Sequence, residues 1–143
     1  MFWKIEVEDR PGIFDAVGSG IKKDIKDLGI DSVEEVRFVQ VYIIEGNLSE
    51  DKVKFIAEEL LVDKVIQTYT LKPRFYNTRD YHTIEVAYNP GVMDPVEDSV
   101  LKGIKDLGIE GVESIKTAKK YIIKGRLNQR ELNTICEKLL YNR

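Results

Sequence analysis

The chain has few of the side chains from which reactive and metal-binding sites are usually built. Among its 143 residues there are one cysteine, Cys136, and one histidine, His82. A lone cysteine excludes an internal disulfide and suits a reducing cytoplasm, where we expect the protein to be located. Cys136 aligns with Ala57 on an apolar helix stripe, which favours a small core residue over a nucleophile. One cysteine and one histidine also fall short of the ligand set of a zinc site.

Long apolar runs and catalytic sequence motifs are absent as well. No apolar stretch approaches the roughly 18 residues that cross a bilayer, and the N-terminus lacks the basic and apolar regions of a signal peptide. No glycine-rich phosphate loop, Gly-x-Ser-x-Gly elbow or His-Glu-x-x-His helix is present. The net charge of −3 argues against a general nucleic-acid binder, which usually has a basic face. We therefore expect no membrane segment, no nucleic-acid partner, and no active site or bound cofactor of the chain's own.

What the chain does contain is an internal repeat at a spacing of 79 residues. About 25 of 57 positions are identical when residues 5–61 are aligned, without a gap, with residues 84–140. Pro11-Gly12 falls on Pro90-Gly91, for example. Two like units on one chain predict pseudo-twofold pairing, like that between the subunits of a homodimer. Each repeat is close to the size at which a single core is only marginally stable, so we expect the two repeats to share a core.

Each repeat predicts a strand, a helix, a long strand and a second helix. Short first strands are expected at Phe2–Val7 and Thr83–Ala87, each followed by a Pro-Gly turn. Gly29 and Gly108 lie where the C-terminal cap of the first helix needs a positive φ angle. The helices themselves are predicted from apolar residues at helical spacing: Val17, Ile21, Ile25 and Leu28 in the first repeat, and Val96, Val100, Ile104 and Leu107 in the second.

The segments between the helices are rich in β-branched and aromatic residues. Val33–Glu45 and Val112–Lys124 therefore predict strands, and neither has Gly, Pro or Asn near its middle. We interpret each as one long, bent strand, with a tight hairpin as the alternative. A closing strand is expected at residues 65–69, and the second repeat has no counterpart to it.

These elements predict an α+β fold. Two repeats of strand-helix-long strand-helix-strand would pair as a pseudo-twofold dimer, with antiparallel sheets covered by helices. Residues 1–72 form the first repeat, residues 73–82 a linker, and residues 83–143 the second repeat, which lacks the final strand. The linker is rich in basic and aromatic residues and includes His82. Two interpretations remain: a connection that runs over the protein surface, or a basic strip that contacts a partner. The pattern agrees equally with a free subunit and with the N-terminal segment of a longer polypeptide.

Two short segments of the second repeat stand out, although each has a local structural explanation. Asp94 is placed to cap the following helix and Pro95 suits its first position, as Asp15 is placed to cap the helix of the first repeat. Lys119-Lys120 replaces the Gln40-Val41 of the first repeat, and a solvated strand face accounts for two lysines. The alternative for both segments is a contact that only one repeat keeps.

With these segments, the second repeat resembles the PurS family, the small subunit of phosphoribosylformylglycinamidine (FGAM) synthase. The resemblance rests on Asn-Pro-Gly-Val-Met-Asp94-Pro95, on Leu-Gly-Ile-Glu-Gly-Val-Glu113-Ser-Ile and on Lys119-Lys120-Tyr121-Ile-Ile. The chain departs from the family pattern in Val-Glu after Asp94-Pro95, where many members have Gln-Gly, and in Lys119, where Gly is usual. The first repeat resembles a more diverged relative. The residues that the resemblance marks as candidates for a partner interface are Pro90, Gly91, Asp94, Pro95, Lys119, Lys120 and Tyr121.

The resemblance implies a non-catalytic role in purine biosynthesis. PurS-type components organise the PurL synthase and PurQ glutaminase parts of FGAM synthase for ammonia transfer. ATP, Mg and glutamine would be used by those partners, and none would be bound by this chain. Some bacterial synthases resemble this layout, with two PurS-like units fused ahead of the catalytic part. A homodimer of such tandem chains would correspond to a tetramer of single PurS subunits.

A second resemblance leads to a different class of function. Asp9, Arg10, Pro11 and Gly12 resemble the opening of ACT domains, which are regulatory modules that bind amino acids. In such a module these four residues would form the ligand turn, with glycine allowing close approach to backbone amides. An ACT fold, however, needs two strands and a turn between its helices, and the second repeat lacks the Asp-Arg pair. A tandem ACT-like amino-acid sensor is therefore the alternative hypothesis.

Overall fold

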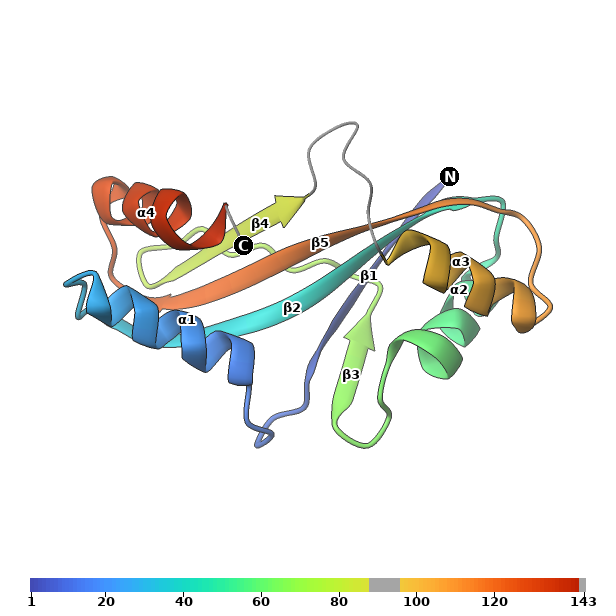
Figure 1. The fold of residues 1–143 in the computed structure, drawn as a ribbon, viewed down its shortest axis with the longest axis horizontal. Coiled ribbons are helices and arrows are strands. Elements are labelled where there is room, and N and C mark those ends of the chain that lie inside the picture. Colours follow the sequence, from blue (N-terminus) through green and yellow to red (C-terminus); the bar gives the residue numbers. More distant parts are fainter. Residues whose placement is uncertain (88–95, 142–143) are drawn as a thin grey trace. The chain divides into compact units, whose positions relative to one another are not determined.

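The computed structural model describes residues 1–87 and 96–141, and its elements follow the predicted order (Figure 1). In the first repeat they are β1 (Phe2–Asp9), α1 (Ala16–Asp27), β2 (Val33–Gly46), α2 (Glu50–Ile56), the π-helical continuation η1 (Ala57–Leu61) and β3 (Gln67–Thr70). In the second repeat they are β4 (Tyr81–Ala87), α3 (Glu97–Asp106), β5 (Val112–Gly125), α4 (Gln129–Ile135) and its π-helical continuation η2 (Cys136–Leu140). The order strand, helix, long strand, helix is confirmed in both repeats.

The strands form one five-stranded antiparallel sheet in the order β3-β1-β2-β5-β4. β2 and β5 are each continuous over 14 residues, so the alternative of a tight hairpin is excluded. The residue before the first strand of each repeat accepts a hydrogen bond from the last residue of the long strand, at positions 79 residues apart. The Gly46 amide donates to the carbonyl oxygen of Met1 at 3.0 Å, and the Gly125 amide donates to that of Asp80 at 2.8 Å. β3, which closes the first repeat as predicted, pairs with β1.

The chain divides into two compact units whose boundaries cut across the repeats. The first unit comprises Met1–Ile13, Gln40–Pro73 and Ala87–Ala118, and the second comprises Phe14–Val39, Arg74–Val86 and Lys119–Arg143. The first unit therefore contains α2 and α3, and the second contains α1 and α4. Each unit combines the first helix of one repeat with the second helix of the other, while β2 and β5 contribute to both units.

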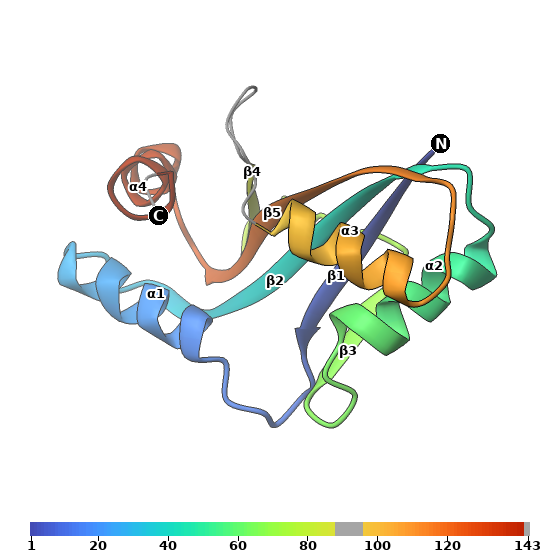
Figure 2. The same cartoon turned by 45° about the vertical axis from the view of Figure 1, so that its right-hand side comes forward.

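The core of the first unit is built by both repeats. α3 lies beside α2 (Figures 1 and 2), and a Cβ added to Gly103 of α3 would lie 2.7 Å from Cδ1 of Leu60 in η1. Such an approach buries the apolar stripes of both helices. The burial of apolar surface is the main favourable contribution to the free energy of folding. The buried core residues are Ile5, Val7, Ile44, Leu48, Val53, Ile56 and Ala57 from the first repeat, and Val100, Ile104, Ile109 and Ile115 from the second.

The core of the second unit has the same mixed origin. Its buried members are Ile21, Ile25, Ile30, Val33 and Val36 from the first repeat, and Tyr121, Ile123, Ile135 and Leu140 from the second. Cys136 is buried in η2, as expected of a small core residue. The prediction that the repeats share a core is confirmed, in two separate cores.

The helix ends follow the predictions where the structure describes them. The Asp15 carboxylate caps α1 by accepting a hydrogen bond from the Gly18 amide at 2.8 Å. Gly29 and Gly108 have φ angles of +88° and +78° after α1 and α3, in the left-handed region that favours glycine. The cap predicted at Asp94-Pro95 lies outside the described residues.

The exposure of several side chains differs from the expected pattern. Val17 of the predicted helix stripe is 47% exposed, because α1 turns Gly18, Ile21 and Ile25 inward instead. The reason is the close approach of Gly18 to β2, where a Cβ would lie 2.1 Å from the carbonyl oxygen of Val36. His82, assigned to the linker, is a buried residue of β4. No helix in the described part of the chain is long and apolar enough to span a bilayer.

Candidate interaction sites

The lysine pair of β5 does not form a solvated strand face, so that interpretation was wrong. Lys119 is half-buried, while Lys120 is only 1% exposed. The Nζ of Lys120 donates a hydrogen bond to the backbone carbonyl oxygen of Arg74, in the segment before β4. A buried ammonium group is tolerated only where such bonds replace its hydration. Lys120 therefore fixes the segment around Arg74 within the second unit.

Tyr121, the next candidate of the predicted interface, is also buried. It is 2% exposed, and its ring packs on that of Phe38 with centroids 5.7 Å apart and planes tilted by 54°. Such tilted aromatic pairs add to the stability gained from burial. Any part that Lys120 and Tyr121 take in partner binding is therefore indirect. The other candidates of the second repeat, Pro90, Gly91, Asp94 and Pro95, lie outside the described residues.

The Asp9–Gly12 segment leads into a tight turn, and the amides of Arg10 and Ile13 form hydrogen bonds within the protein. The Ile13 amide donates to the carbonyl oxygen of Arg10 at 3.0 Å, and Gly12 has a φ angle of +87°. Proline followed by a glycine of positive φ is the sequence of a type II turn. The Arg10 amide donates to Ile66 at 2.8 Å, and its guanidinium group donates to the carbonyl oxygen of Lys64 at 3.1 Å. The Asp-Arg-Pro-Gly sequence thus has a structural explanation.

The strand count also bears on the ACT alternative. Between α1 and α2 the structure has one strand, β2, where an ACT module needs two strands and a turn. The topology therefore does not support the amino-acid sensor, and Asp9, Arg10, Pro11 and Gly12 form a structural turn.

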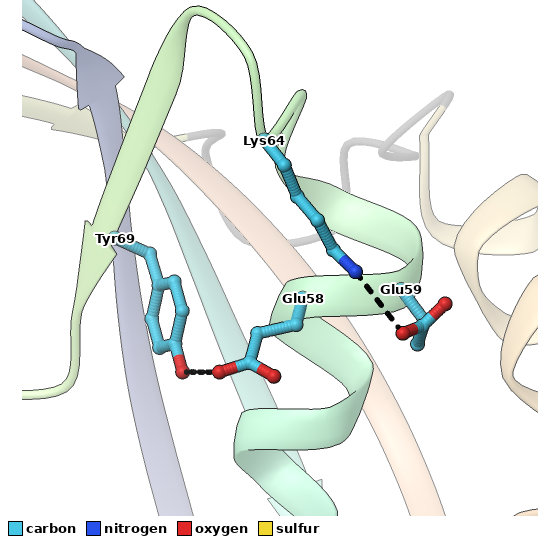
Figure 3. A network of polar contacts seen from close by, with 4 residues as sticks. All are labelled: Glu58, Glu59, Lys64 and Tyr69. Atoms are coloured by element: carbon cyan, nitrogen blue, oxygen red, sulfur yellow. Dashed lines mark hydrogen bonds and ion pairs between the residues drawn. The ribbon is translucent and has the colours of Figure 1, made fainter.

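A polar cluster that the sequence did not reveal joins η1 to β3 and to the loop between them (Figure 3). The hydroxyl group of Tyr69 in β3 donates to Oε1 of Glu58 in η1 at 2.8 Å, and Lys64 pairs with Glu59 at 3.2 Å. Burial first, and then the hydrogen bond to Glu58, raises the pKa of Tyr69 to about 12. Tyr69, Glu58 and Lys64 line a cavity of about 290 Å³ together with Arg10, Val62, Gln67 and Thr68.

The Tyr69–Glu58 hydrogen bond makes this cluster a structural connection between β3 and η1. A phenol with such a pKa stays neutral near pH 7, so it donates a hydrogen bond and does not act as a base or nucleophile. The cluster holds β3 against η1. Within residues 1–87 and 96–141, no three His, Cys, Asp or Glu side chains are grouped so as to hold a metal ion.

Two open grooves occupy equivalent positions in the two repeats, one in each unit. The first, of about 430 Å³, lies along α1 and the loop that follows it. The second, of about 390 Å³, lies along the end of α3 and the loop after it. Three lysines, Lys22, Lys23 and Lys26, line the first groove, whereas Leu101 takes the place of Lys22 in the second. Comparing the aligned repeats for charge differences is the sequence signal that could have found this pair.

Comparisons with known proteins relate both repeats to one family. The sequence model of the PurS family, described as phosphoribosylformylglycinamidine (FGAM) synthase, matches residues 3–74 and 81–143. Among solved structures the chain is similar to Thermus thermophilus PurS, with 34% identity, a TM-score of 0.43, and coverage of 50% of this chain and 90% of that one. It is also similar to Methanocaldococcus jannaschii PurS, described as one of the subunits of formylglycinamide ribonucleotide amidotransferase in the purine biosynthetic pathway. There the identity is 25%, the TM-score 0.46, and the coverage 50% of this chain and 94% of that one. No curated protein sequence matches the chain.

Proposed function

Because the chain belongs to the PurS family, which makes it a tandem PurS repeat of the FGAM synthase system in purine biosynthesis, we propose that it organises the catalytic partners of that enzyme. The partners are a PurL-type synthase and a PurQ-type glutaminase. In this proposal the chain holds the two so that ammonia released from glutamine reaches the synthase. ATP, Mg and glutamine are used by the partners.

One observation carries the proposal: the family model matches both repeats, over nearly the whole chain. The architecture is in keeping with it. Each of the two units has its own buried core, whereas the polar cluster at Tyr69 serves to join β3 to η1. A surface held in place by a packed core is preorganised for binding other proteins. We further propose that the complex works in the cytoplasm, and that the half-buried Lys119 takes part in partner contact together with Pro90, Gly91, Asp94 and Pro95.

Reconstitution with purified PurL and PurQ homologues tests the proposal. FGAM formation is measured with glutamine as the nitrogen source, and in parallel with free ammonium, which bypasses the glutaminase. We expect the chain to raise the glutamine-dependent rate and to leave the ammonium-dependent rate unchanged. An equal effect on both rates, or no gain over PurL and PurQ alone, would contradict the proposal.

Oligomeric state belongs to the same set of measurements. A homodimer of tandem chains would supply the same number of PurS-like units as a tetramer of single subunits. Light scattering on the free chain and on the reconstituted complex distinguishes a monomer, which already holds two repeats, from a homodimer.

A further inference from the structure

The groove along α1, called here the α1 groove, is a basic surface on an acidic protein. Its lining consists of Ser19, Lys22, Lys23, Lys26, Ile30, Asp31 and Val33. The three lysines are exposed and form no ion pair with any residue that the structure describes. Ile30 and Val33 supply an apolar floor, since they are 8% and 9% exposed. Three cations stand against the single carboxylate of Asp31, in a chain whose net charge is −3.

The equivalent groove along α3, called here the α3 groove, serves as an internal reference. Seventy-nine residues further on, the equivalent positions hold Asp98, Leu101, Lys102, Lys105, Ile109, Glu110 and Val112, all of which line the α3 groove except Asp98 and Lys102. The apolar floor is kept and the volume is similar. Among the residues that line the α3 groove itself, one lysine, Lys105, is matched by one carboxylate, Glu110, so the charge is balanced. The basic character of the α1 groove is therefore a property of one repeat and does not follow from the fold.

The lysines of α1 also destabilise their own helix. Lys22 and Lys26 are four residues apart on one helix, where like charges destabilise a helix by roughly 0.2–0.5 kcal/mol per pair. Leu101 and Lys105 at the equivalent positions of α3 avoid this repulsion. A ligand of opposite charge would remove it, because its carboxylates would neutralise both ammonium groups.

We propose that the α1 groove binds an acidic segment of the PurL-type partner, with an apolar side chain seated on Ile30 and Val33. The proposal rests on the proposed function for the identity of that partner. The occupant is a protein segment, because lysines over an apolar floor match alternating acidic and apolar side chains. A long nucleic acid would be repelled by the remainder of an acidic chain. Charge complementarity of this kind raises association rates and selects the correct partner.

The test compares two charge reversals of equal size in the full-length chain. Lys22→Glu with Lys26→Glu alters the α1 groove, and Lys102→Glu with Lys105→Glu changes α3 by the same net charge, with Lys105 in the α3 groove and Lys102 on the same helix outside it. All four side chains are exposed, so both variants should keep the wild-type melting temperature. Binding to the PurL-type partner is measured at low and at high salt. We expect the α1 variant to raise the Kd about tenfold at low salt and the α3 variant to leave it nearly unchanged. Lys22→Gln with Lys26→Gln, which adds no negative charge, should give an intermediate loss.

Other outcomes overturn the proposal. If the wild type binds the partner and both variants lose affinity equally, the effect is one of total charge. If neither loses affinity, the α1 groove is not the contact, although the proposed function still stands through its glutamine-dependent gain. If the wild type neither binds nor activates, the proposed function fails, and a labelled peptide of repeated Glu-Glu-Leu then decides whether the groove takes acidic segments. Lysine-dependent binding of a single-stranded oligonucleotide, but not of that peptide, would contradict a protein occupant.

Discussion

A Cβ added to Gly46 would lie 2.2 Å from the carbonyl oxygen of Gly111, so these two glycines fix how closely the end of β2 approaches the start of β5. The same contact recurs in the second unit between Gly125 and Ser32, where the distance would be 2.3 Å. Both pairs are offset by the 79-residue repeat. The internal repeat thus extends to individual backbone contacts, one in each unit.

Gly46→Ala should destabilise the protein, because the obstructing atom is backbone and cannot rotate away. We expect a loss of about 1–3 kcal/mol, the usual range for forcing extra volume into a packed site. Urea denaturation measures it. Gly20→Ala is the matched control, since Gly20 is exposed within α1 and its Cβ would meet nothing within 4 Å. That variant should gain about 0.5–1 kcal/mol from helix propensity. Equal effects of the two substitutions would contradict the interpretation of Gly46.

Local elements of this fold could be predicted, because their signals are local. Gly29 and Gly108 marked helix ends, and the β-branched runs of β2 and β5 marked strands. The division into units could not be predicted. It depends on which repeat supplies the helix that covers each half of the sheet. Ile104 belongs to the same core as Ile5 and Ile56, and the local pattern of neither repeat indicates this.

Asp15 ties α1 to β2 as well as capping the helix, so its removal should cost more than the loss of an ordinary cap. One carboxylate oxygen accepts from Gly18 and the other from the Phe38 amide, each at 2.8 Å. Asp15→Ala leaves both amides without this acceptor, and we expect a loss of about 2–4 kcal/mol from the cap and the second bond together. Ser49→Ala removes only the cap of α2 and should cost about 1 kcal/mol. Thermal denaturation of both variants checks the difference, and an Asp15→Ala loss no larger than that of Ser49→Ala would exclude a tie to β2.

The candidate partner residues show why side-chain exposure was the weakest sequence inference. Lysine on a strand is usually solvated, and the hydrogen bond of Lys120 goes to the backbone of Arg74, 46 residues away. No pattern within β5 indicates such a bond. The charge contrast between Lys22 and Leu101, by comparison, is visible in the aligned repeats, although only the structure places both residues in grooves.

Val41 and Lys120 occupy equivalent positions in the two repeats, and exchanging their residue types should destabilise the protein for a different reason in each repeat. Val41 is fully buried, so Val41→Lys places an ammonium group where a valine packs, and we expect a loss of about 3 kcal/mol or more. Lys120→Val removes the bond to Arg74 and should cost about 1–3 kcal/mol. It should also speed tryptic cleavage at Arg74 and Arg79. Denaturation and limited proteolysis test both effects. An unchanged cleavage rate in Lys120→Val would show that the bond does not hold this segment.

The pKa of Tyr69 makes stability depend on pH in the alkaline range. An ordinary tyrosine ionises near pH 10, whereas burial and the bond to Glu58 raise the pKa of Tyr69 to about 12. Between these values the folded state keeps a proton that the unfolded state loses, so stability should fall as pH rises from about 10 through about 12. Tyr69→Phe should remove that part of the slope. The phenolate absorbance of the wild type minus that of Tyr69→Phe should titrate near pH 12. Glu58→Gln should lower the midpoint without restoring it to 10, because burial is the larger cause. A difference titration centred near pH 10 would show that the Tyr69–Glu58 contact does not persist in solution.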